Sequence, residues 1–172
     1  KLIVNCLPLN EGERRAFAKA ARDVPQEFVG DEAHRGDMVW SAAVSEELRS
    51  RATAVIGNFP VSQASQYTRL EWLQTFSAGV DAYICPGVLP RGTMVTNASG
   101  AYGQSVSEHM FATMWALMKN LNRYASNQRD HQWQDEGPVL SPEGGIALII
   151  GVGDIGSHFA QLAQSEIGRA HV

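Results

Sequence analysis

The sequence of 172 residues has few of the features that mark membrane, secreted or nucleic-acid-binding proteins. No run of about 18 or more apolar residues is present, as a membrane-spanning helix would require. No basic segment is followed by an apolar stretch and a cleavage site, so no signal peptide is expected. The 14 Lys and Arg residues are outnumbered by 18 Asp and Glu residues and form no basic block, which argues against nucleic acid as a partner. We therefore expect a cytoplasmic protein that binds neither membrane nor nucleic acid.

Cysteine is scarce as well. Cys6 and Cys85 stand far apart and fit no metal-ligand spacing, so the sequence predicts no metal site and two buried, reduced thiols. The remaining composition, 44% apolar and 19% charged, is that of an ordinary globular protein.

Short apolar runs alternate with helical segments over the first 99 residues. Strands are predicted at residues 1–7, 27–30, 37–40, 52–57, 70–76 and 93–97. Helices are predicted over residues 10–22, with Asn10 as N-cap, and over residues 45–51. Because strands that alternate with helices form parallel βαβ units, this region predicts an α/β domain with a parallel sheet.

Apolar residues then recur at three- and four-residue steps over residues 104–124, which predicts one long amphipathic helix. Ser105 and Glu108 have the S-x-x-E spacing of a capping box at its start. This change of period places a domain boundary near Gly100.

A glycine-rich turn follows the most apolar run of the chain. Residues 146–150, IALII, carry no charge and predict a parallel strand covered on both faces. Gly151, Gly153 and Gly156 follow in G-x-G-x-x-G spacing, before another helical pattern. In a dinucleotide site the first glycine permits the tight turn, the second admits the pyrophosphate, and the third lets the helix pack closely.

The first residues of that helix complete the predicted phosphate site. The amides of Asp154 and Ile155 are expected to face the phosphates, where the helix dipole favours anions. The Asp154 side chain must then point away. The acidic residue that would bind the ribose, about 20 positions further on, would fall beyond residue 172, so NAD and NADP are not distinguished. A plain strand-to-helix turn is the alternative.

Three stretches together resemble one family. They are WLQTFSAGVDAY (72–83), VTNASGAYGQSVSEHMFATMWALMKNL (95–121) and LIIGVGDIG (148–156). They occur in the order seen in D-isomer-specific 2-hydroxyacid dehydrogenases, the relatives of phosphoglycerate, glyoxylate/hydroxypyruvate and D-lactate dehydrogenases. The weaker VIGNFP (55–60) extends the resemblance over nearly the whole chain.

The resemblance implies a flavodoxin-like substrate-binding domain over residues 1–99. Residues 100–166 are then the N-terminal part of an NAD(P)-binding Rossmann-type domain, with a long helix and only its first βα unit. The implied parent protein is an oxidoreductase that transfers hydride between NAD or NADP and a small 2-hydroxy or 2-keto acid.

The resemblance also implies the site residues. Consecutive amides of the SAGV turn are expected to hold the substrate carboxylate as an anion nest, unless Asp81 only caps the next helix there. The predicted substrate-binding residues are Asn58, Phe59, Ser77, Ala78, Gly79 and Val80. The predicted cofactor-binding residues are Ser105, Gly151, Gly153, Asp154, Ile155 and Gly156. For Ser105 the N-cap role is preferred, and Glu108 is expected to be structural.

No catalytic residue is predicted. In the family a histidine acts as general acid and base, an acidic residue orients it, and an arginine binds the carboxylate. None of the three has a counterpart here. Because no histidine has an evident orienting partner in the sequence, each is expected to be structural or solvated; the five are His34, His109, His131, His158 and His171. We therefore expect the chain alone to be inactive. We also expect it to be unstable near residues 146–150, because a single strand cannot bury both faces without neighbouring strands.

The final residues 167–172, IGRAHV, coincide with a translation of a common short-read sequencing adapter, which reads Ile-Gly-Arg-Ala-His-Val before a stop codon. We expect this tail not to be native.

Other functions and assemblies remain open. One is an NAD-sensing, corepressor-like binding protein of the same fold. Another is a different two-domain Rossmann dehydrogenase, such as alanine dehydrogenase or adenosylhomocysteinase, although the SAGVD block argues against it. Finally, the apolar stripe of the long helix predicts either a homodimer contact in the full-length protein or packing within the chain. Its residues are Met110, Met114, Trp115 and Met118.

Overall fold

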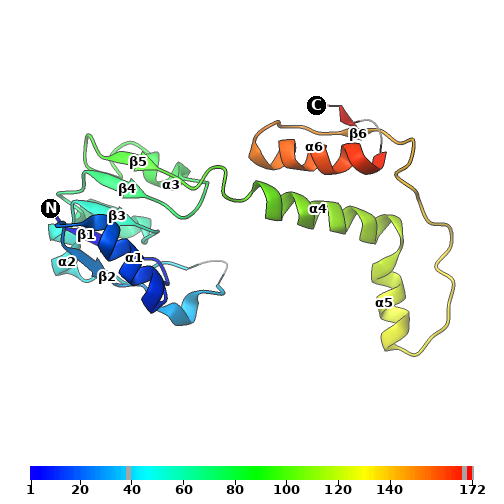
Figure 1. Ribbon diagram of the computed structural model, residues 1–172, viewed down its shortest axis with the longest axis horizontal. Coiled ribbons are helices and arrows are strands. Elements are labelled where there is room, and N and C mark those ends of the chain that lie inside the picture. The colour runs from blue at the N-terminus through cyan, green and yellow to red at the C-terminus, as the bar shows by residue number, and fades with distance from the viewer. Residues whose placement is uncertain (38–39, 168–169, 172) are drawn as a thin grey trace. The chain divides into compact units, whose positions relative to one another are not determined.

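The computed structural model describes residues 1–37, 40–167 and 170–171, and it divides the chain into two compact units (Figure 1). Unit 1 is Lys1–Ser99 and unit 2 is Gly100–Val172. Each unit has its own sheet.

Unit 1 is built on a five-stranded parallel sheet with the order β2-β1-β3-β4-β5. The strands are β1 (Ile3–Asn5), β2 (Gln26–Phe28), β3 (Ala54–Ile56), β4 (Trp72–Gln74) and β5 (Met94–Thr96). This is the flavodoxin-like order, in which ligands bind beyond the carboxyl ends of the strands. The predicted parallel α/β fold is confirmed. The strand predicted at 37–40 includes residues 38 and 39, which lie outside the described residues.

Helices and short 3-10 segments connect these strands. They are α1 (Glu11–Ala21), η1 (Glu32–His34), α2 (Glu46–Arg51), η2 (Val61–Gln66) and α3 (Asp81–Ile84). Helix α1 begins as predicted, because Asn10 accepts a hydrogen bond from the Glu13 amide (2.9 Å) and the Glu13 carboxylate accepts one from the Asn10 amide (3.0 Å). Both guanidinium NH groups of Arg35 donate to Glu13, at 2.5 and 2.6 Å. The loop after β2 is therefore tied to the start of α1.

The core of unit 1 forms where apolar strand residues meet aromatic rings from the loops. Val4, Val55 and Leu73 lie side by side on β1, β3 and β4 and are fully buried. Phe59 stacks on Tyr67, with ring centroids 4.2 Å apart. Burying such side chains stabilises the fold by about 1.5–3 kcal/mol each, which gives unit 1 a core of its own.

Only one of the two cysteines is buried as predicted. Cys6 follows β1 and is fully buried, and this burial raises the pKa of its thiol to about 12. Cys85 is exposed. The prediction of a second buried thiol is wrong because α3 ends after four residues, at Ile84, and leaves the next residue in a solvent-facing turn.

Unit 2 consists mainly of helices. They are α4 (Gly103–Met118), α5 (Leu121–Arg129) and α6 (Asp154–Ile167). Helices α4 and α6 lie side by side (Figure 1), with Phe111 of α4 edge-on to Phe159 of α6 at a centroid distance of 5.9 Å. Ser107 and Ala163 are buried in this unit.

The single helix predicted over residues 104–124 is wrong, since the structure has two helices there. Asn120 adopts the left-handed conformation, with φ of 53°, between α4 and α5. Asparagine tolerates this conformation better than most residues. The apolar period runs across the break from Met118 to Leu121, so the pattern alone does not reveal the change in direction.

The capping box predicted at Ser105 and Glu108 is also wrong. Helix α4 already begins at Gly103 and has no side-chain cap, which leaves Ser105 exposed inside the first turn. The Glu108 carboxylate instead accepts a hydrogen bond from the Gln104 side chain at 3.0 Å. The helix can start two residues early because Gly103 packs closely on α6, a tertiary contact that no local pattern contains.

The apolar run at residues 146–150 forms only a short strand. Strand β6 (Ala147–Leu148) pairs in parallel with β7 (Ala170–His171). Ile146, Leu148 and Ile150 are 73%, 75% and 92% exposed. The run is thus uncovered in this chain, where its described sheet has two strands; the strand covered on both faces stays a prediction for the complete domain.

Part of the tail that is expected to be non-native pairs with this strand. Ile167 ends α6 and is buried, and β7 belongs to the tail, whereas residues 168, 169 and 172 lie outside the described residues. Whether 167–172 are native stays a prediction, which sequencing of the gene decides. Among the described residues, no helix has the length and hydropathy needed to cross a membrane.

Candidate functional site

Two loops of unit 1 leave the carboxyl ends of neighbouring strands. Asn58 and Phe59 follow β3, and residues 77–80 follow β4, which pairs with β3 in parallel. Because parallel strands end at the same edge of a sheet, the two loops lie next to each other.

The side chain of Asn58 joins these loops. Its Nδ2 donates to Ser77 Oγ at 3.2 Å, and its Oδ1 accepts a hydrogen bond from the Phe76 amide, also at 3.2 Å. Both ends of the side-chain amide are therefore engaged with the protein. Asn58 positions the turn after β4.

The carbonyl groups of that turn are held by nearby side chains. Thr75 Oγ1 donates to the Ser77 carbonyl at 2.8 Å, and Asn97 Nδ2 donates to the Ala78 carbonyl at 2.7 Å. Ser77 Oγ donates to the Gly79 carbonyl at 2.9 Å. Three consecutive peptide groups are thus fixed through their oxygen atoms.

The amide groups of the same turn remain available. In the part of the chain that the structure describes, the amides of residues 77–80 donate no hydrogen bond to a protein group. Ala78 and Gly79 are exposed. Successive unpaired N–H groups in a turn form an anion-binding nest, and a carboxylate could accept from them.

Phe59 lies in a different environment from its predicted neighbours. Its side chain is 1% exposed between Tyr67 and Tyr83. The Tyr83 hydroxyl accepts from the Phe59 amide at 3.1 Å and donates to its carbonyl at 2.6 Å. Phe59 therefore supports the loop from the core, and it has no free group with which to contact a substrate.

Each glycine of the G-x-G-x-x-G turn in unit 2 has its own local geometry. Gly151 has φ of 101°, a conformation that other residues rarely adopt. A Cβ on Gly156 would overlap the Gly151 carbonyl oxygen, so only glycine lets α6 start this close to the turn. A Cβ on Gly153 would meet no atom within 4 Å, which leaves open space beside the turn.

Helix α6 begins directly after this open space. The Ser157 amide donates to the Gly153 carbonyl at 2.9 Å, and the amides of the first helical residues precede it. Such amides have no acceptor within a helix, and the helix dipole adds a partial positive charge at the same end. The turn therefore fits a phosphate group.

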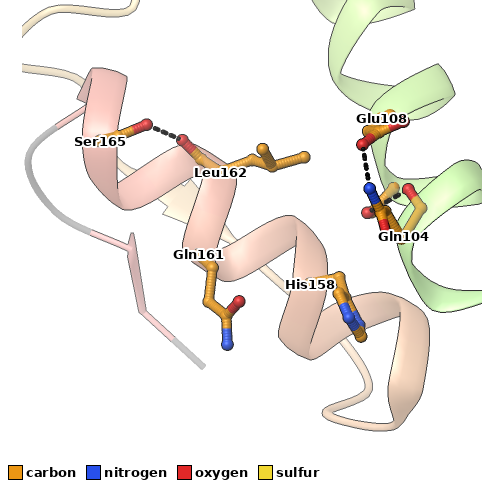
Figure 2. Close-up of a pocket in the computed structure, with 7 residues that line it drawn as sticks. Gln104, Glu108, His158, Gln161, Leu162 and Ser165 are labelled. Carbon is orange, nitrogen blue, oxygen red and sulfur yellow. Dashed lines mark hydrogen bonds between the residues drawn. The ribbon is translucent and has the colours of Figure 1, made fainter.

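A groove of about 260 Å³ lies between α4 and α6 (Figure 2). It is lined by Gln104, Ser107, Glu108, His158, Gln161, Leu162 and Ser165. Neither Ser105 nor the glycines of the turn belong to this lining. The predicted place of Ser105 near the cofactor stays a prediction.

The expectation that no histidine has an orienting partner is wrong for two of the five. The Nδ1 of His34 lies 2.7 Å from a carboxylate oxygen of Asp37, at the surface. The Nδ1 of His158 lies 3.4 Å from a carboxylate oxygen of Asp154. Their i,i+3 and i,i+4 spacings are the signal that the sequence offered.

Within the described residues, the side chains of His109 and His131 have no carboxylate partner. His109 and His131 are exposed, and His171 belongs to β7. Within the described residues, no three His, Cys, Asp or Glu side chains are grouped as metal ligands.

Residues 111–169 match the family model described as "D-isomer specific 2-hydroxyacid dehydrogenase, NAD binding domain". The resemblance predicted from the sequence is confirmed, and so is the nicotinamide dinucleotide class of the cofactor that this description names. The match includes the whole glycine-rich turn.

Solved structures share the fold. A D-isomer specific 2-hydroxyacid dehydrogenase family protein from Aeromonas salmonicida has 22% identity and a TM-score of 0.74, over 96% of this chain and 50% of that one. D-lactate dehydrogenase from Aquifex aeolicus, complexed with NAD and lactic acid, has 19% identity and a TM-score of 0.72, over 96% and 48%. The acyclic imino acid reductase Bsp5, in complex with NADPH and D-Arg, has 19% identity and a TM-score of 0.71, over 98% and 54%. The chain thus spans about half the length of the structures that it matches.

Proposed function

We propose that this chain supplies the substrate unit and the first part of the cofactor unit of a cytoplasmic, NAD(P)-dependent 2-hydroxyacid dehydrogenase. The observation that carries the proposal is the glycine-rich turn, where Gly151, Gly153 and Gly156 have the three geometries that a dinucleotide site needs. The family match over 111–169 supports it. When bound, the nicotinamide ring supplies hydride exchange with C2 of a small hydroxy or keto acid.

In unit 1, the turn after β4 would bind the substrate carboxylate. The amides of Ser77, Ala78, Gly79 and Val80 are the donors, since their N–H groups have no protein acceptor among the described residues. Asn58 orients them through Ser77, and Phe59 holds the neighbouring loop.

In unit 2, the glycine-rich turn would bind the cofactor diphosphate. The amides of Asp154, Ile155 and Gly156 are at the start of α6 and would donate to its oxygen atoms. Gly153 leaves the room for them to approach. Ser105 is also proposed to lie near the cofactor.

The chain alone would bind without turnover, because it has no assigned arginine, acid and histidine for the chemical step. The proposed parent protein is a homodimer. The support is that Met110 is 45% exposed on α4, while Met114, Trp115 and Met118 are half-buried and fit packing within the chain equally well.

The test is a pair of substitutions in the full chain. Gly153→Ala adds a methyl group where no protein atom lies within 4 Å, so the variant should fold normally and bind NADH and NADPH at least about tenfold more weakly, since the diphosphate loses its close approach. Gly36→Ala is the matched control, because a Cβ there also meets nothing within 4 Å, and it should bind like the wild type.

Binding is measured by nicotinamide fluorescence and folding by circular dichroism. Equal binding by wild type and Gly153→Ala, or none by the wild type, would refute the proposal. Turnover of glyoxylate, hydroxypyruvate or pyruvate above background would refute the expected inactivity of the chain.

A further inference from the structure

Three residues of unit 2 meet beside the glycine-rich turn. Asp154 is the first residue of α6 and directly follows Gly153, and His158 lies one helical turn later on the same helix. Gly103 is the first residue of α4. The i,i+4 spacing of Asp154 and His158 is visible in the sequence, whereas the contact of Gly103 with both residues is not.

The imidazole of His158 faces two oxygen atoms of Asp154. Its Nδ1 lies 2.8 Å from the backbone carbonyl oxygen and 3.4 Å from Oδ1 of the carboxylate. Because both atoms are acceptors, Nδ1 must carry the hydrogen. His158 is thus a donor directed at Asp154, and its ring borders the groove drawn in Figure 2.

Gly103 provides the space in which this contact forms. A Cβ at this position would overlap the Asp154 carboxylate and the His158 Nδ1. The carboxylate therefore lies against the bare backbone at the start of α4. Gly103 is buried there.

The carboxylate of Asp154 presents an electrostatic difficulty for the proposed function. It is attached to the residue whose amide would donate to the diphosphate, and two anions so close repel each other. A histidine that is hydrogen-bonded to the Asp154 carbonyl and lies 3.4 Å from the carboxylate lowers the repulsion in two ways, by keeping the carboxylate on the α4 side and by placing the polar N–H beside its charge.

We propose that His158 is a positioning residue for the cofactor site, which holds the Asp154 carboxylate against Gly103 and away from the amides that bind the diphosphate. This inference rests on the proposed function. His158 itself touches no phosphate in this proposal, and its effect passes entirely through Asp154.

The first experiment replaces His158 in the full chain and measures NADH binding by fluorescence. His158→Ala should weaken binding roughly fivefold, the size expected for one partly exposed polar contact with a charged group. His158→Asn places an amide N–H near the position of Nδ1 and should recover most of the affinity. His109→Ala is the matched control, since it removes an exposed histidine from α4, and it should leave binding unchanged.

The second experiment removes the charge instead of the donor. Asp154→Asn should bind NADH as tightly as the wild type or more tightly. In the Asp154→Asn background, His158→Ala should cost little further affinity, because its partner charge is gone. A purely structural role of His158 would give additive losses instead, and additive losses would overturn the proposal.

The outcomes separate this proposal from the function on which it rests. If the wild type binds neither NADH nor NADPH, the proposed function fails and this inference fails with it. If the wild type binds and His158→Ala binds equally well, only the role of His158 is refuted. Should His158→Ala unfold unit 2, as thermal unfolding would show, weaker binding by Asp154→Asn than by the wild type overturns the proposal by itself.

Discussion

Unit 1 and unit 2 use similar apolar strand sequences in different ways. In unit 1, Val4, Val55 and Leu73 occupy adjacent strands of a five-stranded sheet and are fully buried. In unit 2, Leu148 and Ile150 belong to an equally apolar run, yet they are 75% and 92% exposed, because the sheet there has two strands. An apolar run becomes core only when other elements cover its faces.

The two candidate sites differ in the same sense. The turn of residues 77–80 is held by Thr75, Asn58 and Asn97 through several hydrogen bonds. The glycine-rich turn is held by fewer hydrogen bonds, from the Ser157 amide to the Gly153 carbonyl and from Ser157 Oγ to the Val152 carbonyl, together with the close approach of Gly156 to the Gly151 carbonyl. The substrate turn should therefore keep its shape under stress better than the cofactor turn.

Truncation of an apolar strand residue should give the largest difference in lost stability between the two units. Leu73→Ala removes a fully buried side chain from the central part of the sheet and should lower the unfolding free energy of unit 1 by about 2–5 kcal/mol. Leu148→Ala, at 75% exposure in β6, should change that of unit 2 by less than about 0.5 kcal/mol. Urea unfolding followed by circular dichroism measures both. Equal losses would contradict the comparison.

A smaller effect is expected at the close approach in unit 2. Gly156→Ala forces a methyl group onto the Gly151 carbonyl and should destabilise unit 2 by about 1–3 kcal/mol. Gly153→Ala is the matched control and should leave stability unchanged. Hydrogen exchange at the start of α6 would locate the loss; unaltered protection there in Gly156→Ala would show that the contact is unimportant.

Helix caps give a third contrast. Asn10→Ala breaks a complete capping box on α1 and should cost unit 1 about 1 kcal/mol. At Ser105 the sequence predicts a cap that the structure lacks. Ser105→Ala should therefore change stability by less than about 0.5 kcal/mol. Thermal unfolding of both variants measures the two losses of stability. A loss for Ser105→Ala as large as that for Asn10→Ala would show that the predicted capping box is present after all.

The smallest effect concerns pH and Glu13. The hydrogen bonds from Arg35 and then from the Asn10 amide lower the pKa of this carboxyl from 4.5 to about 2. A lowered pKa in the folded state means that Glu13 contributes its full stability above about pH 4.5 and loses it as the pH falls toward 2. The stability gap between wild type and Glu13→Gln should close over that range. A gap that stays constant with pH would show that the carboxylate charge is not involved.

Local signals predicted the parts of the fold whose causes are local. Asn10 and Glu13 are three residues apart, and their capping box needs no other element. The parallel sheet follows from the alternation of strands and helices. At the glycine-rich turn, the spacing alone identified the residues whose geometry the structure then explains.

The features that the sequence did not predict depend on contacts or backbone conformations that no pattern within a few residues encodes. The start of α4 at Gly103 depends on α6, some 50 residues away in the sequence. The buried state of Phe59 depends on Tyr83, and the exposure of Cys85 depends on where α3 ends. The break at Asn120 is a backbone conformation that apolar spacing does not record.

The fixed carbonyls of residues 77–79 have a consequence for how a ligand would bind. Their partners Thr75, Asn97 and Ser77 are part of the folded protein, so the conformational entropy of ordering the turn is already spent when folding is complete. On the proposed function, a small organic acid would dock onto a preorganised surface. Its affinity would then be decided by desolvation and charge, with little contribution from loop closure.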